Sequence, residues 1–309
     1  MSIWGRILFT VVFLSAPCLI ATKAMAAPDY SRNLNHLFDI TKAGSVDLVL
    51  PTDVEINKSG IYIVDSGNNR VVVFDHQGKF LFSFGRQGSG RGEFLDPVGL
   101  GLGKNGQIYV ADTGNHRIQI FSNKGQFKNQ INILDGKTPV RPIDVVSHPD
   151  TGYIYVSGNN NHKLMVYSRQ GKKVTEWGGN GANSGKFRYP ATIALTKDSD
   201  IAVVDVLNSR IQLFQPDGRF LVNIGKWGVL PGQLFRPKGV AADRHGQIYV
   251  SDSYMNLIQV FHDSGKLLHV LRPRGKRKSM MSPTGIAVRN KHLYVSEMLR
   301  HRVSVFKLE

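Results

Sequence analysis

Cysteine is nearly missing from this sequence of 309 residues, which contains only Cys18 near the N-terminus. Cys18 lies in an apolar leader that we expect to be removed, so the remaining chain has neither a disulfide nor a thiolate nucleophile. Small extracellular domains that depend on disulfides because their cores are small are therefore excluded. Pro17 stands where a lipoprotein signal has a small residue, so we expect no lipid attachment.

Long hydrophobic runs are also missing outside the first 26 residues. There, Arg6 precedes the apolar run Ile7–Leu14, and Ala24-Met25-Ala26 has the small residues of a cleavage site. This pattern predicts a signal peptide over residues 1–26 and export to the periplasm or the outside of a bacterial cell. An uncleaved anchor is the alternative, but the run is shorter than a bilayer span and Pro17 interrupts it. No transmembrane segment is predicted in the mature chain.

Acidic residues are few relative to basic ones, and the formal charge is +16. Removal of Arg6 and Lys23 with the leader still leaves a large positive excess. Such a charge attracts anionic partners but says nothing about the fold. Because an exported protein does not meet nucleic acid, we expect a protein or an anionic polymer as the partner.

The chain is built from a repeat that begins at six prolines, spaced 45 to 48 residues apart: Pro51, Pro97, Pro142, Pro190, Pro237 and Pro283. Each proline is followed by a short apolar strand, a second strand and a third strand, and the second strand ends at an acidic residue in every repeat except the third, which has Gly158. A period of 40 to 50 residues with several strands per unit is typical of a β-propeller with one blade per repeat. We predict an all-β, six-bladed propeller with four-stranded antiparallel blades over residues 34–309, preceded by a linker over 27–33.

The last repeat is too short to make a complete blade. Its third strand, Arg302–Phe306, lies at the end of the sequence, whereas Leu37–Ile40 near the other end has the pattern of a fourth strand. We therefore expect the N-terminal strand to complete the sixth blade and close the ring. Closure of this kind removes unpaired strand edges that would promote aggregation.

Two loops carry the motif Asp-x-Gly-Asn-x-Arg, at residues 112–117 and 65–70, and the inner strands read Pro-x-Gly-Ile-Ala-Val or similar. With these motifs the sequence resembles the NHL-repeat family over residues 34–309. The resemblance implies a six-bladed propeller that serves as a recognition platform. The recurring acid–arginine pairs are interpreted as structural anchors between strands, since an active site would not repeat around a ring. The anchor residues are Asp65, Arg70, Asp112, Arg117, Asp205, Arg210 and, with Glu297, Arg302.

The connections between blades share one face with the turns between second and third strands, and this face is where loops carry function. The connection over 272–282 has five basic residues and no acidic one. Basic residues beside methionines and an aromatic ring are typical of a partner-binding patch. A solvated basic loop over ordinary packing residues is the alternative. The candidate residues are Arg272, Arg274, Lys276, Arg277, Lys278, Met280, Met281, Tyr254, Met255 and Met298.

An enzyme is the alternative function, because the resemblance includes propeller lyases that hold zinc through three histidines and lactonases with channel carboxylates. The histidines here are scattered, and no metal or other cofactor is predicted. Asp53 and Asp144 occupy equivalent inner-strand positions and are the candidate channel carboxylates. They either bind a cation or accept hydrogen bonds from local backbone amides. The preferred interpretation is a monomeric, non-catalytic scaffold or sensor that binds its partner on the basic connection face.

Overall fold

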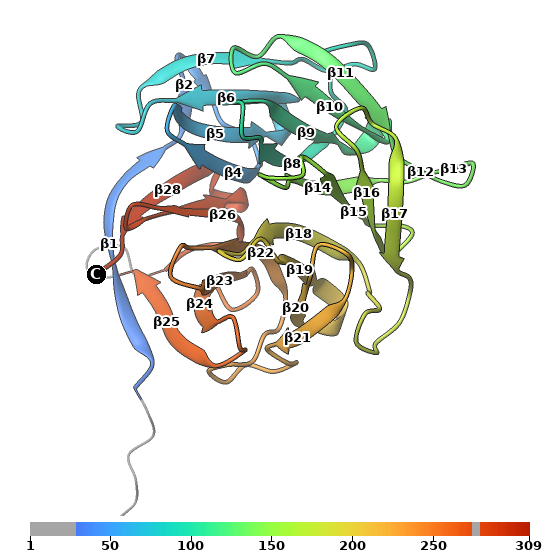
Figure 1. The fold of residues 1–309 in the computed structure, drawn as a ribbon. Helices are drawn as coiled ribbons and strands as arrows, with labels where there is room; N and C mark the ends of the chain where they lie inside the picture. Colours follow the sequence, from blue (N-terminus) through green and yellow to red (C-terminus); the bar gives the residue numbers. More distant parts are fainter. Residues whose placement is uncertain (1–28, 274–278) are drawn as a thin grey trace, which may run out of the picture.

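The computed structural model describes residues 29–273 and 279–309, which form six four-stranded blades arranged around a central channel (Figure 1). Blades 1 to 4 are separate sheets, whereas blades 5 and 6 are joined into one eight-stranded sheet. The predicted all-β propeller with six antiparallel blades is confirmed. The only helices in this part of the chain are short 3₁₀ turns, and none of them is long and apolar enough to cross a membrane.

Each blade runs from an inner strand at the channel to an outer strand at the rim, and in blades 1 to 5 the four strands follow one another in the sequence. Blade 1 contains β4 (Pro51–Asn57), β5 (Gly60–Asp65), β6 (Arg70–Phe74) and β7 (Phe80–Phe84). Blade 2 contains β8 (Pro97–Leu102), β9 (Ile108–Asp112), β10 (Arg117–Phe121) and β11 (Phe127–Asn132). Blade 3 contains β14 (Pro142–Ser147), β15 (Ile154–Gly158), β16 (Lys163–Tyr167) and β17 (Lys173–Gly178). Each inner strand begins at its repeat's proline.

The second half of the ring follows the same order. Blade 4 contains β18 (Pro190–Leu195), β19 (Ile201–Asp205), β20 (Arg210–Phe214) and β21 (Phe220–Ile224). Blade 5 contains β22 (Pro237–Ala242), β23 (Gln247–Asp252), β24 (Leu257–His262) and β25 (Leu267–Pro273). Blade 6 contains β26 (Pro283–Arg289), β27 (His292–Glu297), β28 (Arg302–Lys307) and β1 (Ser31–Ile40).

Short elements fill the connections on one face. Two small hairpins are β2 (Lys42–Ala43) with β3 (Val46–Asp47), and β12 (Leu134–Asp135) with β13 (Thr138–Pro139). Four 3₁₀ turns follow second strands: η1 (Ser66–Asn68), η2 (Thr113–Asn115), η3 (Val206–Asn208) and η4 (Met298–Arg300).

Strand β1 closes the ring, as predicted from its sequence, but it does so in two ways. Its second half pairs antiparallel with β28, from Asn35 opposite Lys307 to Ile40 opposite Val303. Its first half pairs in parallel with β25 of blade 5, beginning with Ser31 opposite Val270. Figure 1 shows β1 as the blue strand that spans both blades. Residues 31–33, predicted as linker, therefore belong to the strand.

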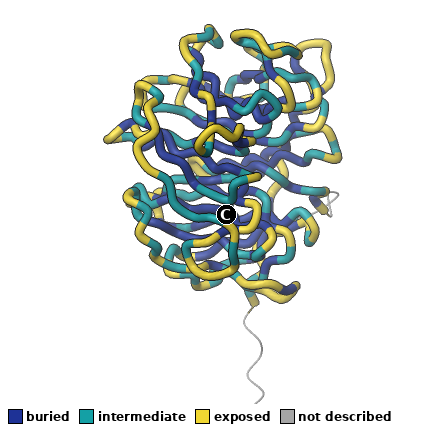
Figure 2. Tube along the Cα trace, turned by 90° about the vertical axis from the view of Figure 1, so that its right-hand side faces the viewer, coloured by how far each residue is buried: buried dark blue, intermediate teal, exposed yellow. Residues whose placement is uncertain are grey.

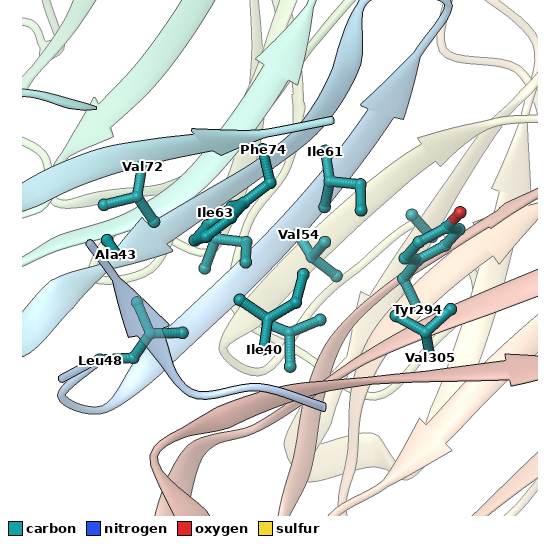
Figure 3. Close-up of a cluster of buried hydrophobic side chains, with 12 residues drawn as sticks. Ile40, Ala43, Leu48, Val54, Ile61, Ile63, Val72, Phe74, Tyr294 and Val305 are labelled. Carbon is teal, nitrogen blue, oxygen red and sulfur yellow. The ribbon is translucent and has the colours of Figure 1, made fainter. Parts of the chain in front are cut away.

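Blades are held together by apolar side chains packed between neighbouring sheets. At the closure, Ile40 from β1 lies with Val54 from blade 1 and with Tyr294 and Val305 from blade 6 (Figure 3). Figure 2 shows that buried residues form the interior of the blades while exposed residues lie mainly in the turns. Because opposite faces of each sheet pack on different neighbours, the middle strands are apolar at nearly every position.

Candidate functional site

The acidic residue that ends a second strand fixes the blade connection next to it. Asp112 is fully buried and accepts a hydrogen bond from the backbone N–H of Leu95, two residues before Pro97, at 2.8 Å. Asp65 accepts the equivalent N–H of Val49 at 2.7 Å, and Asp205 that of Arg188 at 2.7 Å. Each acid therefore positions the chain just before it enters the channel.

The paired arginine extends this anchor into the connection itself. Arg117 Nε donates to Asp112 Oδ2 at 2.7 Å, and its Nη2 donates to the carbonyls of Gly90 and Glu93. Arg70 Nε lies 2.8 Å from Asp65 Oδ2, Arg210 Nε lies 2.9 Å from Asp205 Oδ2, and Arg302 Nε lies 3.3 Å from Glu297 Oε1. Arg302 also contacts Asp39 of β1 at 3.2 Å. The pairs thus hold the connection face rigid.

Histidines of the anchor loops also accept hydrogen bonds from backbone N–H groups. His301 Nδ1 accepts the N–H of Leu50 at 3.0 Å, and His162 Nδ1 accepts that of Tyr189 at 3.1 Å. Among the described residues no group of three His, Cys, Asp or Glu side chains is arranged to hold a metal ion. These histidines act as structural acceptors in the folded chain.

A cup of about 460 Å³ opens at the start of the channel on the connection face. All six blades contribute to its wall the residue that follows the repeat's proline: Thr52, Val98, Ile143, Ala191, Lys238 and Thr284. Five of these side chains are neutral. Lys238 is the single cation in the ring, so the sixfold repeat is broken at one chemically specific position.

The environment of Lys238 is only partly hydrated. Burial lowers the pKa of Lys238, and the charge of Arg236 at the rim of the cup lowers it further. No described carboxylate forms an ion pair with Lys238 or Arg236. An anionic group entering the cup would therefore gain an ion pair in a site of reduced water access.

Exposed apolar side chains line the cup at Tyr189 and Leu207, and others lie on the neighbouring connections and turns. Trp227 is 71% exposed and Tyr254 is 61% exposed, and Phe235 lies between them with ring centroids 6.2 Å and 4.2 Å away, respectively. Further exposed apolar residues on the connections and 3₁₀ turns of blades 4 to 6 are Tyr189, Leu207, Val229, Leu230, Met281 and Leu299. Such a cluster is larger than the isolated apolar residues of an ordinary surface and marks an interaction site.

The structure describes only some of the residues predicted to form the partner-binding patch. Tyr254 and Met281 are exposed, Arg272 is exposed at the end of β25, and Met255 and Met298 are half-buried, with Met298 lining the cup. The prediction that Met280 belongs to this patch was wrong, because its side chain is 1% exposed and packs in the core between blades 5 and 6. The basic residues that the prediction emphasised fall outside the described residues: Arg274, Lys276, Arg277 and Lys278.

The two predicted channel carboxylates accept backbone hydrogen bonds. Asp53 accepts the N–H groups of Val54 and, across the blade boundary, Leu100, each at 2.9 Å. Asp144 does the same with Val145 and Ile193, each at 2.8 Å. These carboxylates therefore tie neighbouring inner strands together. Burial raises the pKa of Asp53 to about 7 and raises that of Asp144 as well, with a further contribution from the charge of Asp53.

Glu55 is a third channel acid, which the sequence argument missed. It lies two residues after Asp53 on the same side of β4 and lines a cavity of about 190 Å³ at the opposite end of the channel. Burial raises its pKa to about 8, with a further contribution from Asp53. The period of two in a β-strand was the signal that would have found it.

Comparison with known families agrees with this geometry. The NHL repeat model matches residues 94–121 and 236–261, and a model described as a 6-bladed beta-propeller matches residues 43–105. These matches support a propeller that contains NHL repeats. No curated protein sequence matches it.

Solved structures with the same fold include several enzymes. A streptogramin B lyase superposes with a TM-score of 0.63 at 16% identity, covering 89% of this chain and 88% of the lyase. Virginiamycin B lyase from Staphylococcus aureus, crystallised with quinupristin, gives 0.62 at 17% identity, covering 88% and 84%. A gluconolactonase from Xanthomonas campestris gives 0.63 at 14% identity, covering 92% and 98%. At these identities the likeness establishes the fold of this NHL-repeat propeller and not its activity.

Proposed function

We propose that this NHL-repeat propeller is an exported, monomeric and non-catalytic scaffold or sensor that binds a protein partner on its connection face. The observation that carries the proposal is the cup, in which one lysine stands among five neutral ring residues and exposed apolar side chains form the rim. A protein segment with apolar residues and a carboxylate complements both features.

The energetic centre of this surface is expected at blades 4 and 5. Trp227, Phe235 and Tyr254 form a row of contacting aromatic rings. Phe235 precedes Arg236 in the sequence, and Arg236 lines the cup together with Lys238. Aromatic residues and arginine dominate the binding energy of protein interfaces. An anionic polymer would use the positive charge but would leave the apolar rim without a partner, so a protein is favoured.

Site-specific photocrosslinking in cells of the source organism tests the proposal. A photoreactive residue replaces Tyr254 or Leu299 at the rim, and a matched control replaces exposed Leu81 on outer strand β7. We expect one protein to crosslink at both rim positions and not at the control. The purified partner should then bind Lys238→Met and Trp227→Ala variants at least about tenfold more weakly, which corresponds to about 1.4 kcal/mol.

Dextran sulfate serves as the anionic-polymer probe in the same experiment. Binding of dextran sulfate that depends steeply on salt, with no protein crosslinked at the rim, would replace the protein partner with a polymer. Equal crosslinking at the rim and at β7 would contradict a docking site on the connection face.

A lyase or hydrolase remains the second candidate function, favoured by the solved enzymes of this fold and by the raised pKa values of Asp53 and Glu55. The backbone hydrogen bonds accepted by Asp53 and Asp144 argue for a structural role of these two groups. If the protein has lactonase or lyase activity and the Asp53→Ala and Asp144→Ala variants retain it, these two carboxylates have no catalytic role.

A further inference from the structure

Turns between third and fourth strands normally cover the junction between two blades on the face opposite the cup. Gly78 in such a turn lies against Phe38 of the preceding blade, Gly125 lies against Phe84, and Gly218 lies against Trp177. At the junction of blades 2 and 3, Arg169 from the turn of blade 3 helps to line a cavity of only about 180 Å³.

The junction of blades 5 and 6 is different because of how the ring closes. The fourth strand of blade 6 is β1, which precedes the other strands of the ring, so no turn joins it to β28. Between the two blades lies a cavity of about 720 Å³, which we call the seam pocket. This volume is in the range of pockets that bind small molecules.

The seam pocket combines an apolar wall with positive charge. Its wall includes Val260, Leu271 and Val288, and its polar lining includes Gln247 and the Tyr249 ring. Four side chains with permanent charge line it: Arg32, Arg244, Arg289 and Lys291. None of these four forms an ion pair with another described residue, so their charge is available to a ligand.

The two carboxylates at the pocket already have donors within the protein. Asp243 Oδ1 accepts the backbone N–H groups of His245 and Gln247, and its Oδ2 accepts the Tyr249 hydroxyl at 3.3 Å. Glu309 accepts from the side-chain amide of Asn35 at 3.2 Å. Burial lowers the pKa of His269 on β25, with a further contribution from Arg32, so this ring adds no charge near neutral pH.

We propose that the seam pocket binds a small organic anion, in which a carboxylate or phosphate group is attached to an apolar body. The guanidinium groups of Arg244 and Arg289 would hold the acid group, since this fork matches carboxylate and phosphate oxygens. Leu271 and Val288 would contact the apolar body. The site lies on the face opposite the cup and does not depend on the proposed partner.

Fluorescence titration with 8-anilinonaphthalene-1-sulfonate, an anion on an aromatic body, tests the proposal. The seam variant is Arg244→Glu with Arg289→Glu. Its matched control is Lys104→Glu with Arg169→Glu, which makes the same change of charge on the same face at the smaller 180 Å³ cavity. A third variant, Lys238→Met, reports any binding of the dye in the cup.

We expect the dye to bind the seam variant at least about tenfold more weakly, with less than about a twofold change for the control and for Lys238→Met. Competition by hexanoate or by inorganic phosphate then identifies the preferred acid group. Equal weakening in the seam variant and its control would overturn the proposal in favour of general charge attraction. Absence of saturable binding to the unmodified protein, or loss only in Lys238→Met, would also overturn it.

Discussion

Arg117 provides the sharpest test of how the connection face is held. Its side chain makes four hydrogen bonds: to Asp112 at 2.7 Å, to Gln130 at 3.1 Å, and to the carbonyls of Gly90 and Glu93 at 2.7 and 3.0 Å. Asp112 is completely buried. The variant Arg117→Met keeps most of the aliphatic stem but removes the charge, so it leaves a buried carboxylate without its cationic partner.

Removal of one member of a buried ion pair costs about 3–5 kcal/mol. Asp112 keeps donors from Leu95, Asn115 and Gln119, which favours the lower part of this range. The lower part is about 3–4 kcal/mol. For a chain of this size each kcal/mol lowers the melting temperature by about 2 °C, so we expect a decrease of roughly 6–8 °C.

Urea unfolding followed by circular dichroism gives the free energy, and Arg219→Met is the control. Arg219 is exposed and bonds only to Gln215 across its own turn, so its loss should cost less than about 1 kcal/mol. The double variant Asp112→Asn with Arg117→Met should lose less than the sum of its two single variants. A single Arg117→Met variant as stable as the Arg219→Met control would refute the anchoring role.

Two further predictions concern the channel and the closure. The pKa values of Asp53 and Glu55 are raised to about 7 and about 8, so the folded chain retains protons that the unfolded chain releases. The stabilisation given by the two protonated carboxyl groups is therefore complete below about pH 4 and is lost as the pH rises toward 8. Between pH 5 and 8, the free energy of unfolding measured in urea titrations should fall less for the Glu55→Gln variant than for the unmodified protein. Parallel pH profiles of the two proteins would contradict the raised pKa of Glu55. Deletion of residues 1–40 removes β1 and exposes the edges of β25 and β28, so light scattering should show association that a deletion of residues 1–28 does not cause. A monodisperse monomer after the longer deletion would disprove the need for β1.

The repeat could be predicted because every blade packs against its neighbours in the same way and uses similar residues at equivalent positions. Pro51 and its five equivalents begin the inner strands as expected, and Leu37–Ile40 pairs with β28 as its pattern indicated. The parallel pairing of Ser31 with Val270 could not be predicted, since residues 31–33 are polar and have no period of two. Their pairing depends on where the ring places the edge of blade 5.

Site residues were less predictable because exposure depends on tertiary position. Met280 lies in a sequence segment whose composition is typical of a surface patch, but its side chain packs in the core between two blades. The position of Lys238 could not be predicted from the sequence, because its surroundings consist of five residues brought together from other blades. Asp53 and Asp144 were identified from their shared register, and their side chains accept backbone hydrogen bonds, which was one of the two alternatives considered.

Chemical specificity in this propeller lies where the repeat is interrupted. A feature that recurs in several blades, such as the acid–arginine anchor, must satisfy a need common to those blades and therefore belongs to stability. Among the six residues that follow the repeat prolines only Lys238 is charged, and no turn between third and fourth strands covers the junction of blades 5 and 6. Packing requires neither of them, since the other five blades lack the lysine and the junction of blades 2 and 3 closes to about 180 Å³. We therefore expect ligand binding, rather than folding, to account for the residues at these two departures.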